Sequence, residues 1–141
     1  MENYLYFRSD STVGNEDDET AGSTVYPVSA FRGMVSGTAT ALGVVADDAD
    51  AFSMFFTPKG HIAAGGAADT DDAAADNVDV VVVAITTDNN QKAVMKSLVH
   101  AMNGSVNGLQ QGFIEVFDAV TGTKVDSDIE GVTIVHTVAA D

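Results

Sequence analysis

The chain has 141 residues, no cysteine, and 21 acidic residues against six basic ones, giving a formal net charge of −15 at pH 7. A chain of this length is expected to fold as one domain, residues 1–141, that buries roughly 68–70% of its unfolded surface. The lack of cysteine excludes disulfides, zinc–thiolate sites and thiol nucleophiles. The negative charge argues against nucleic acids and anionic membranes as partners, because both repel an acidic protein.

No segment has the features of a membrane span or a targeting signal. The longest fully apolar run, Val80–Ile85, is far shorter than the roughly 20 residues that cross a bilayer. Met1 is followed by Glu2, without a basic and then apolar leader, so no signal peptide is expected. Synthesis in a cytosol is the resulting expectation.

The chain opens with a predicted strand over residues 4–8. Its side chains alternate between two faces, with Leu5 and Phe7 on one face and Tyr4, Tyr6 and Arg8 on the other. We interpret it either as an edge strand of its own sheet or as an arm that pairs with a neighbouring subunit. Residues 9–23 are polar and acidic and predict an exposed loop. Residues 24–28 are extended, and Pro27 favours a sheet edge or a strand end.

A hairpin is predicted next. Residues 31–35 are expected to bend at Arg32-Gly33. Residues 38–46 and 51–57 are predicted to pair across a turn at 47–50, because aspartate tolerates the backbone angles that turns require. In the second strand, one face carries Phe52, Met54 and Phe56, and the other carries Phe55.

The middle of the chain contains the clearest strand and helix signals. Residues 59–77 are rich in Gly, Ala and Asp and predict a long exposed loop. The valine-rich run Val78–Thr86 predicts a central strand covered on both sides. Asp88 lies three residues before Gln91, the spacing of a capping box at a helix start. An amphipathic helix is predicted over about 89–103. Its apolar stripe is Val94, Leu98, Ala101 and Met102, and its polar stripe is Lys92, Lys96, His100 and Asn103.

Two further strands are predicted after the helix, over 113–118 and 130–138, with a turn at Thr121-Gly122 between them. A strand–helix–strand unit favours a parallel, right-handed crossover, while the 104–112 link also permits an antiparallel return. The predicted fold class is α+β: a β-rich mixed sheet or sandwich with one amphipathic helix packed on it.

No catalytic residue is predicted and no cofactor is expected. His61 and His100 are interpreted as solvated, and His136 as a core or subunit-interface residue, because no two histidines have metal-ligand spacing. The chain has no Gly-x-Ser-x-Gly elbow and no phosphate-binding glycine loop. A hydrolase that uses one of the histidines is the last-ranked hypothesis.

The acidic clusters offer weak candidates for calcium ligands: Asp47, Asp48, Asp50, Asp69, Asp71 and Asp72. The run from Asp69 begins like an EF-hand loop, but its sixth position is Ala74 and its twelfth is Val80, where that loop needs Gly and Glu. Solvated acidic loops are the favoured interpretation. A calcium- or small-ligand-binding β module is the alternative function.

Several segments together resemble small virion structural proteins of marine tailed bacteriophages that infect cyanobacteria. They are Tyr4-Leu5-Tyr6-Phe7-Arg8, Tyr26-Pro27-Val28, Phe31-Arg32-Gly33-Met34, the Phe-rich hairpin segment and the strand–helix unit at 78–103. The resemblance implies a non-enzymatic, self-associating capsid decoration or cement protein, often trimeric. Such a protein is made in the host bacterial cytoplasm and binds the major capsid protein on the virion surface. A tail or neck component is the second alternative.

Any such contact is expected to use apolar and aromatic surfaces, because the acidic loops favour water. The predicted interface residues are Tyr4, Leu5, Tyr6, Phe7, Arg8, Phe31, Arg32, Met34 and His136.

Overall fold

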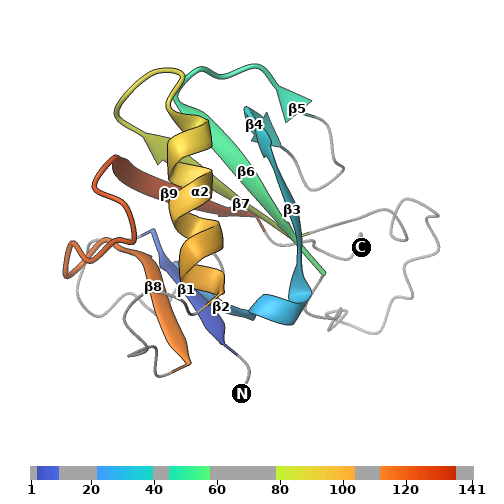
Figure 1. Ribbon diagram of the computed structural model, residues 1–141, viewed down its shortest axis with the longest axis vertical. Helices are drawn as coiled ribbons and strands as arrows, with labels where there is room; N and C mark the ends of the chain where they lie inside the picture. Colours follow the sequence, from blue (N-terminus) through green and yellow to red (C-terminus); the bar gives the residue numbers. More distant parts are fainter. Residues whose placement is uncertain (1–2, 10–21, 40–44, 58–78, 104–111, 136–141) are drawn as a thin grey trace.

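The computed structural model describes residues 3–9, 22–39, 45–57, 79–103 and 112–135. Over these ranges the chain forms two main sheets, one small hairpin and one α-helix (Figure 1). The predicted α+β class, β-rich with one helix packed on sheets, is confirmed. The predicted loop at 59–77, with Asp69, Asp71 and Asp72, lies outside the described residues, and so do His61 and His136.

The first sheet has three strands, in the order β2-β1-β8. β1 (Tyr4–Arg8) runs antiparallel to β2 (Ser23–Pro27) and parallel to β8 (Phe113–Asp118). β1 is therefore the central strand, and its interpretation as an edge strand or an arm is wrong. Both of its backbone edges already pair within its own sheet. β2 is an edge strand, as Pro27 predicted.

The second sheet has four antiparallel strands, in the order β3-β6-β7-β9. They are β3 (Phe31–Ser36), β6 (Ala51–Phe56), β7 (Asp79–Ile85) and β9 (Ile129–Val135). β7 is an interior strand, as the valine run predicted. One of its faces is fully buried, but the other is only partly covered, because Val82 and Ala84 remain half-exposed beside buried Val80.

The partner of β6 differs from the predicted hairpin. β6 pairs with β3, so residues 31–36 form a strand and not a bend. Gly33, at φ +141°, accommodates the register shift in this pair. The segment predicted as the first hairpin strand holds two short strands that pair with each other, β4 (Thr38–Ala39) and β5 (Val45–Ala46). A short 3₁₀ turn, η1 (Val28–Ala30), connects β2 to β3.

The helix α2 (Gln91–Met102) confirms the predicted helix, but not its capping box. Its N-cap residue is Asn90, whose side chain makes no capping hydrogen bond. The side-chain amide of Gln91 (Nε2) instead donates to the backbone carbonyl oxygens of Asp48 (3.1 Å) and Ala49 (2.9 Å). A buried amide needs such acceptors, and this pair of bonds ties the 47–50 turn to the helix start.

The strands that flank α2 lie in different sheets, so the predicted parallel crossover is wrong. β8 joins β1 in the first sheet, and β9 then returns antiparallel beside β7. Figure 1 shows α2 in front of both sheets. One buried cluster unites the two sheets and the helix: Leu5, Phe7, Tyr26, Phe52, Met54, Phe56, Val81, Val83, Ile85, Val94, Leu98, Ala101, Met102, Ile114, Val116, Phe117, Ile129, Val132 and Ile134.

Phe56 is the aromatic link between the sheets. Its ring stacks on Tyr26 of β2 at a centroid distance of 4.2 Å and meets the edges of Phe7 and Phe31 at 5.8 Å each. Such aromatic pairs contribute about 0.5–1.5 kcal/mol each beyond the area that they bury. The four aromatic rings therefore fix how the three-stranded sheet packs against the four-stranded sheet.

Candidate functional site

The outer face of the three-stranded sheet carries three aromatic side chains, Tyr4, Tyr6 and Phe113, here called the aromatic patch. Tyr4 is 42% exposed and Phe113 is 50% exposed, whereas Tyr6 is half-buried. Tyr4 pairs in register with Phe113, and the Tyr6 and Phe113 rings lie 5.3 Å apart. Strand alternation produces this arrangement, because it turns Leu5 into the core and its two tyrosine neighbours outward.

Neighbouring residues extend the aromatic patch across all three strands. On β2, Pro27 lies opposite Tyr4 and Val25 lies opposite Tyr6, both partly exposed. On β8, Glu115 lies opposite Tyr6 and is the charged residue at the border. The described part of this face is therefore mainly apolar on a chain whose net charge is −15.

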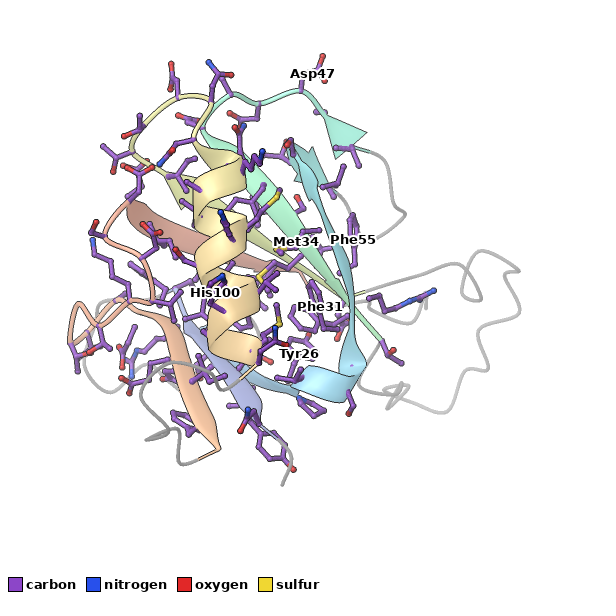
Figure 2. The ribbon with its side chains drawn as sticks, viewed as in Figure 1. Tyr26, Phe31, Met34, Asp47, Phe55 and His100 are labelled. Atoms are coloured by element: carbon purple, nitrogen blue, oxygen red, sulfur yellow. The ribbon has the colours of Figure 1, made fainter. Side chains whose placement is uncertain are left out.

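The structure separates the predicted interface residues into three groups. Tyr4 and Tyr6 face outward in the aromatic patch. Leu5, Phe7 and Arg8 are at most 3% exposed, so their placement on a contact surface is corrected: they lie inside the protomer. Phe31 and Met34 are half-buried against the core, and Arg32 is exposed on β3; Figure 2 labels Phe31 and Met34. His136 lies outside the described residues.

Phe113 was absent from the predicted interface. Its place on the same strand face as Glu115 was visible in the sequence, but its pairing with Tyr4 was not. Only the parallel register of β1 and β8 brings the two rings onto the same face.

A buried polar contact joins the two sheets beneath this surface. The Tyr26 hydroxyl donates to Oδ2 of Asp79 at 2.6 Å, and the two residues are 1% and 2% exposed. Burial, and then the hydrogen bond to Asp79, raise the pKa of Tyr26 far above its ordinary value. A phenol held neutral in this way is a structural donor between β2 and β7.

The acidic turn of Asp47, Asp48 and Asp50 lies at one end of the molecule, where Figure 2 labels Asp47. The Asp50 amide donates to Oδ1 of Asp48 at 3.2 Å. Hydrogen bonding between the two side chains lowers the pKa of Asp48 and raises the pKa of Asp50. Among the described residues, no three acidic or histidine side chains come together as a metal site. The turn thus brings two candidate ligands together without completing a cage.

A hollow of about 390 Å³ lies beside α2, lined by Ala93, Lys96, Ser97, His100 and Val125. The Ser97 hydroxyl donates to Oδ2 of Asp126 at 2.7 Å and lies 3.3 Å from the Ala93 carbonyl oxygen. In a serine hydrolase the serine hydroxyl bonds to the histidine, which in turn bonds to the carboxylate. The bond from Ser97 straight to a carboxylate instead anchors the β8–β9 connection to the helix.

A second acid of the same connection, Asp128, binds the start of α2. It accepts hydrogen bonds from the Thr87 hydroxyl (2.9 Å), the Thr87 amide (3.2 Å) and the Asn90 side chain (3.0 Å). These bonds, with Asn90 the largest cause, hold the pKa of Asp128 below its ordinary value. Asp126 and Asp128 therefore tie the β8–β9 connection to α2 and to the residues just before it.

Comparison of the chain with protein-family models, with curated proteins and with solved structures gave no significant match. Within the described ranges, no helix has the length and apolar character needed to cross a membrane.

Proposed function

We propose that this protein is a non-enzymatic structural subunit that works by self-association, with the aromatic patch as the centre of the contact. The observation that carries the proposal is the exposure of Tyr4 and Phe113 on an otherwise acidic protein. Aromatic residues are enriched and acidic residues depleted at the centre of protein interfaces. A mainly apolar face is also where like-charged copies meet with the least repulsion.

The buried area indicates how much the aromatic patch contributes. Covering the exposed halves of Tyr4 and Phe113 removes on the order of 100 Å² each from water, or about 5 kcal/mol for both at ~25 cal/mol per Å². Association costs on the order of 4–15 kcal/mol before any net affinity appears. The two rings therefore act as anchors, and the surrounding contacts must supply the rest of an interface of about 800 Å² per partner.

The assembly that we propose is a tailed-phage particle, with this protein as a capsid decoration or cement protein bound to the major capsid protein. The resemblance of the segments at 4–8, 26–28 and 31–34 to virion structural proteins supports this assignment. The surplus of acidic residues suits a subunit on a particle exterior, because like-signed surfaces oppose aggregation between particles. A tail or neck position is the alternative placement in the same particle.

The proposal has two levels, the virion role and self-association, and each is tested by its own measurements. Mass spectrometry of purified phage particles is expected to detect the chain in stoichiometric amounts, and its absence from the particles would overturn the virion role. Cryo-electron microscopy of the same particles then places the subunit on the head or on the tail. Self-association is tested separately on the isolated protein, so that one level can fail without the other.

A further inference from the structure

β3 leaves one backbone edge open at the margin of the four-stranded sheet (Figure 1). The Gly37 amide donates to the carbonyl oxygen of Ala51 on the β6 side, at 2.9 Å. Backbone groups of alternate residues point to opposite edges of a strand, so those of Met34 and Ser36 point away from β6. Within the described residues, no hydrogen bond satisfies them on that side. Unpaired groups of this kind are a template for a further strand.

The other edges of the two main sheets are protected among the described strands. β2 carries Pro27, which lacks an N–H group. β8 is bonded along its outer edge by the carbonyl oxygen of Thr123 and the amide of Val125. β9 carries the exposed side chain of Glu130. Charged side chains and proline commonly block edge pairing, and residues 33–36 of β3 contain neither.

Charge also favours β3 as a meeting point between copies of this chain. No acidic residue occurs between Glu19 and Asp47, the part of the sequence that contains β2, β3, β4 and β5. The charged residue within β3 is Arg32, which is exposed. The Ser36 end of β3 lies beside the start of β6, next to the acidic turn at 47–50. An antiparallel second copy brings its own Arg32 to this end, where opposite charges attract.

We propose that the outer edge of β3 pairs antiparallel with the same edge of a second copy, with Val35 on the two-fold axis. In this register Met34 of each copy exchanges a pair of hydrogen bonds with the second copy's Ser36. Val35 is 36% exposed and faces its counterpart in a non-hydrogen-bonded pair, where side chains approach most closely. Its neighbours on that face of the strand are Gly33 and Gly37, which leave room for the contact.

The contact is small and is separate from the aromatic patch, which lies on the other sheet. A stable interface buries about 800 Å² per partner, and pairing over so short a segment covers much less. The contact is therefore weak between free copies. It becomes significant where the aromatic patch already holds copies close together, because their effective concentration is then higher. A subunit with two separate self-contacts can build assemblies larger than a pair.

The test uses the absence of cysteine from the chain, so that a single introduced thiol reports the pairing. In the proposed register the two Val35 Cα atoms lie ~4.5 Å apart, within the roughly 4.4–6.8 Å that a disulfide spans. With oxidised glutathione, Val35→Cys is expected to form disulfide-linked dimers about tenfold faster than Val99→Cys at equal protein concentration, measured by non-reducing electrophoresis. Val99 is the matched control, because it is 42% exposed on a different element, α2.

A second comparison adds Ser36→Pro to Val35→Cys. The Ser36 amide points away from β6, so proline removes an edge donor without removing a bond of the sheet, and circular dichroism verifies the fold. The added proline is expected to abolish the preference for Val35→Cys over Val99→Cys. In the Tyr4→Ser/Phe113→Ser background, which lacks the aromatic patch, the preference is expected to persist. Equal rates for the two cysteine variants, a preference that survives Ser36→Pro, or one that vanishes without the aromatic patch would each overturn the proposal.

Discussion

Replacing Tyr26 with phenylalanine removes one oxygen atom from the buried contact between the sheets. The ring keeps its stacking on Phe56, while the Asp79 carboxylate loses its 2.6 Å hydrogen bond at a position only 2% exposed. Hydrogen bonds to charged groups contribute about 1.5–3 kcal/mol to stability. We expect Tyr26→Phe to lower the free energy of unfolding by about 2 kcal/mol at pH 7.

The same bond predicts how this difference depends on pH. The pKa of Tyr26 is raised in the folded state, so above the ordinary value of 10.0 the unfolded chain loses the phenolic proton while the folded chain keeps it. The unfolded state then binds fewer protons, and wild-type stability falls as pH rises. By pH 11 the wild type has lost about 1.4 kcal/mol of stability in this way. Tyr26→Phe does not lose this stability, because phenylalanine has no phenolic proton. The wild-type advantage is therefore expected to shrink to about 0.6 kcal/mol at pH 11, from the two estimates above.

Urea unfolding followed by circular dichroism at pH 7, 9 and 11 measures both effects. Tyr4→Phe is the matched control, because Tyr4 is 42% exposed and its substitution should change stability by less than about 0.5 kcal/mol. The reasoning is refuted if Tyr26→Phe is as stable as the wild type at pH 7. It is also refuted if the difference between them stays constant from pH 9 to pH 11.

Two further substitutions test the local structure. Gly37 has φ +102°, and an added Cβ would collide with the backbone oxygen of Ala46, so Gly37→Ala should cost at least about 2 kcal/mol in thermal unfolding. Gly33→Ala, also at positive φ but with open space around it, should cost less, and equal losses would contradict the steric argument. Asp128→Asn should destabilise the protein at pH 7, and the difference should vanish as pH falls. The pKa of Asp128 is lowered, so its contribution is present above 3.8 and lost below the folded value. A variant as stable as the wild type at pH 7 would contradict this.

The local elements could be predicted from side-chain periodicity, whereas their pairing could not. The valine run of β7 identifies an interior strand, although it does not show which face is more buried. The spacing of Phe52 and Met54 in β6 and the apolar stripe of α2 each identify one element and a buried face. The alternation of β1 is the same for an edge strand and a central strand, so it does not identify its neighbours. The β8 partner of β1 comes from the far end of the chain, and sequence spacing does not reveal that register.

For the candidate surfaces, too, the sequence predicts the local direction of side chains but not which strands or segments meet. The outward direction of Tyr4 and Tyr6 follows from alternation, but the addition of Phe113 requires the β1–β8 register. Leu5 and Phe7 were assigned to a contact surface because the whole segment was taken as one unit, although their alternation already directed them inward. The basic stripe on α2 follows from helical spacing, whereas its hollow depends on where Val125 lies.

Sedimentation equilibrium of the wild-type protein and of the Tyr4→Ser/Phe113→Ser double variant tests self-association through the aromatic patch most directly. Val99→Ser is the matched control, because Val99 is 42% exposed on α2, on a different element. We expect the wild type and the control to sediment at a multiple of the 14.6 kDa protomer mass, and the double variant at 14.6 kDa. A wild type that stays at 14.6 kDa at every concentration, or a double variant that keeps the wild-type mass, would contradict the account.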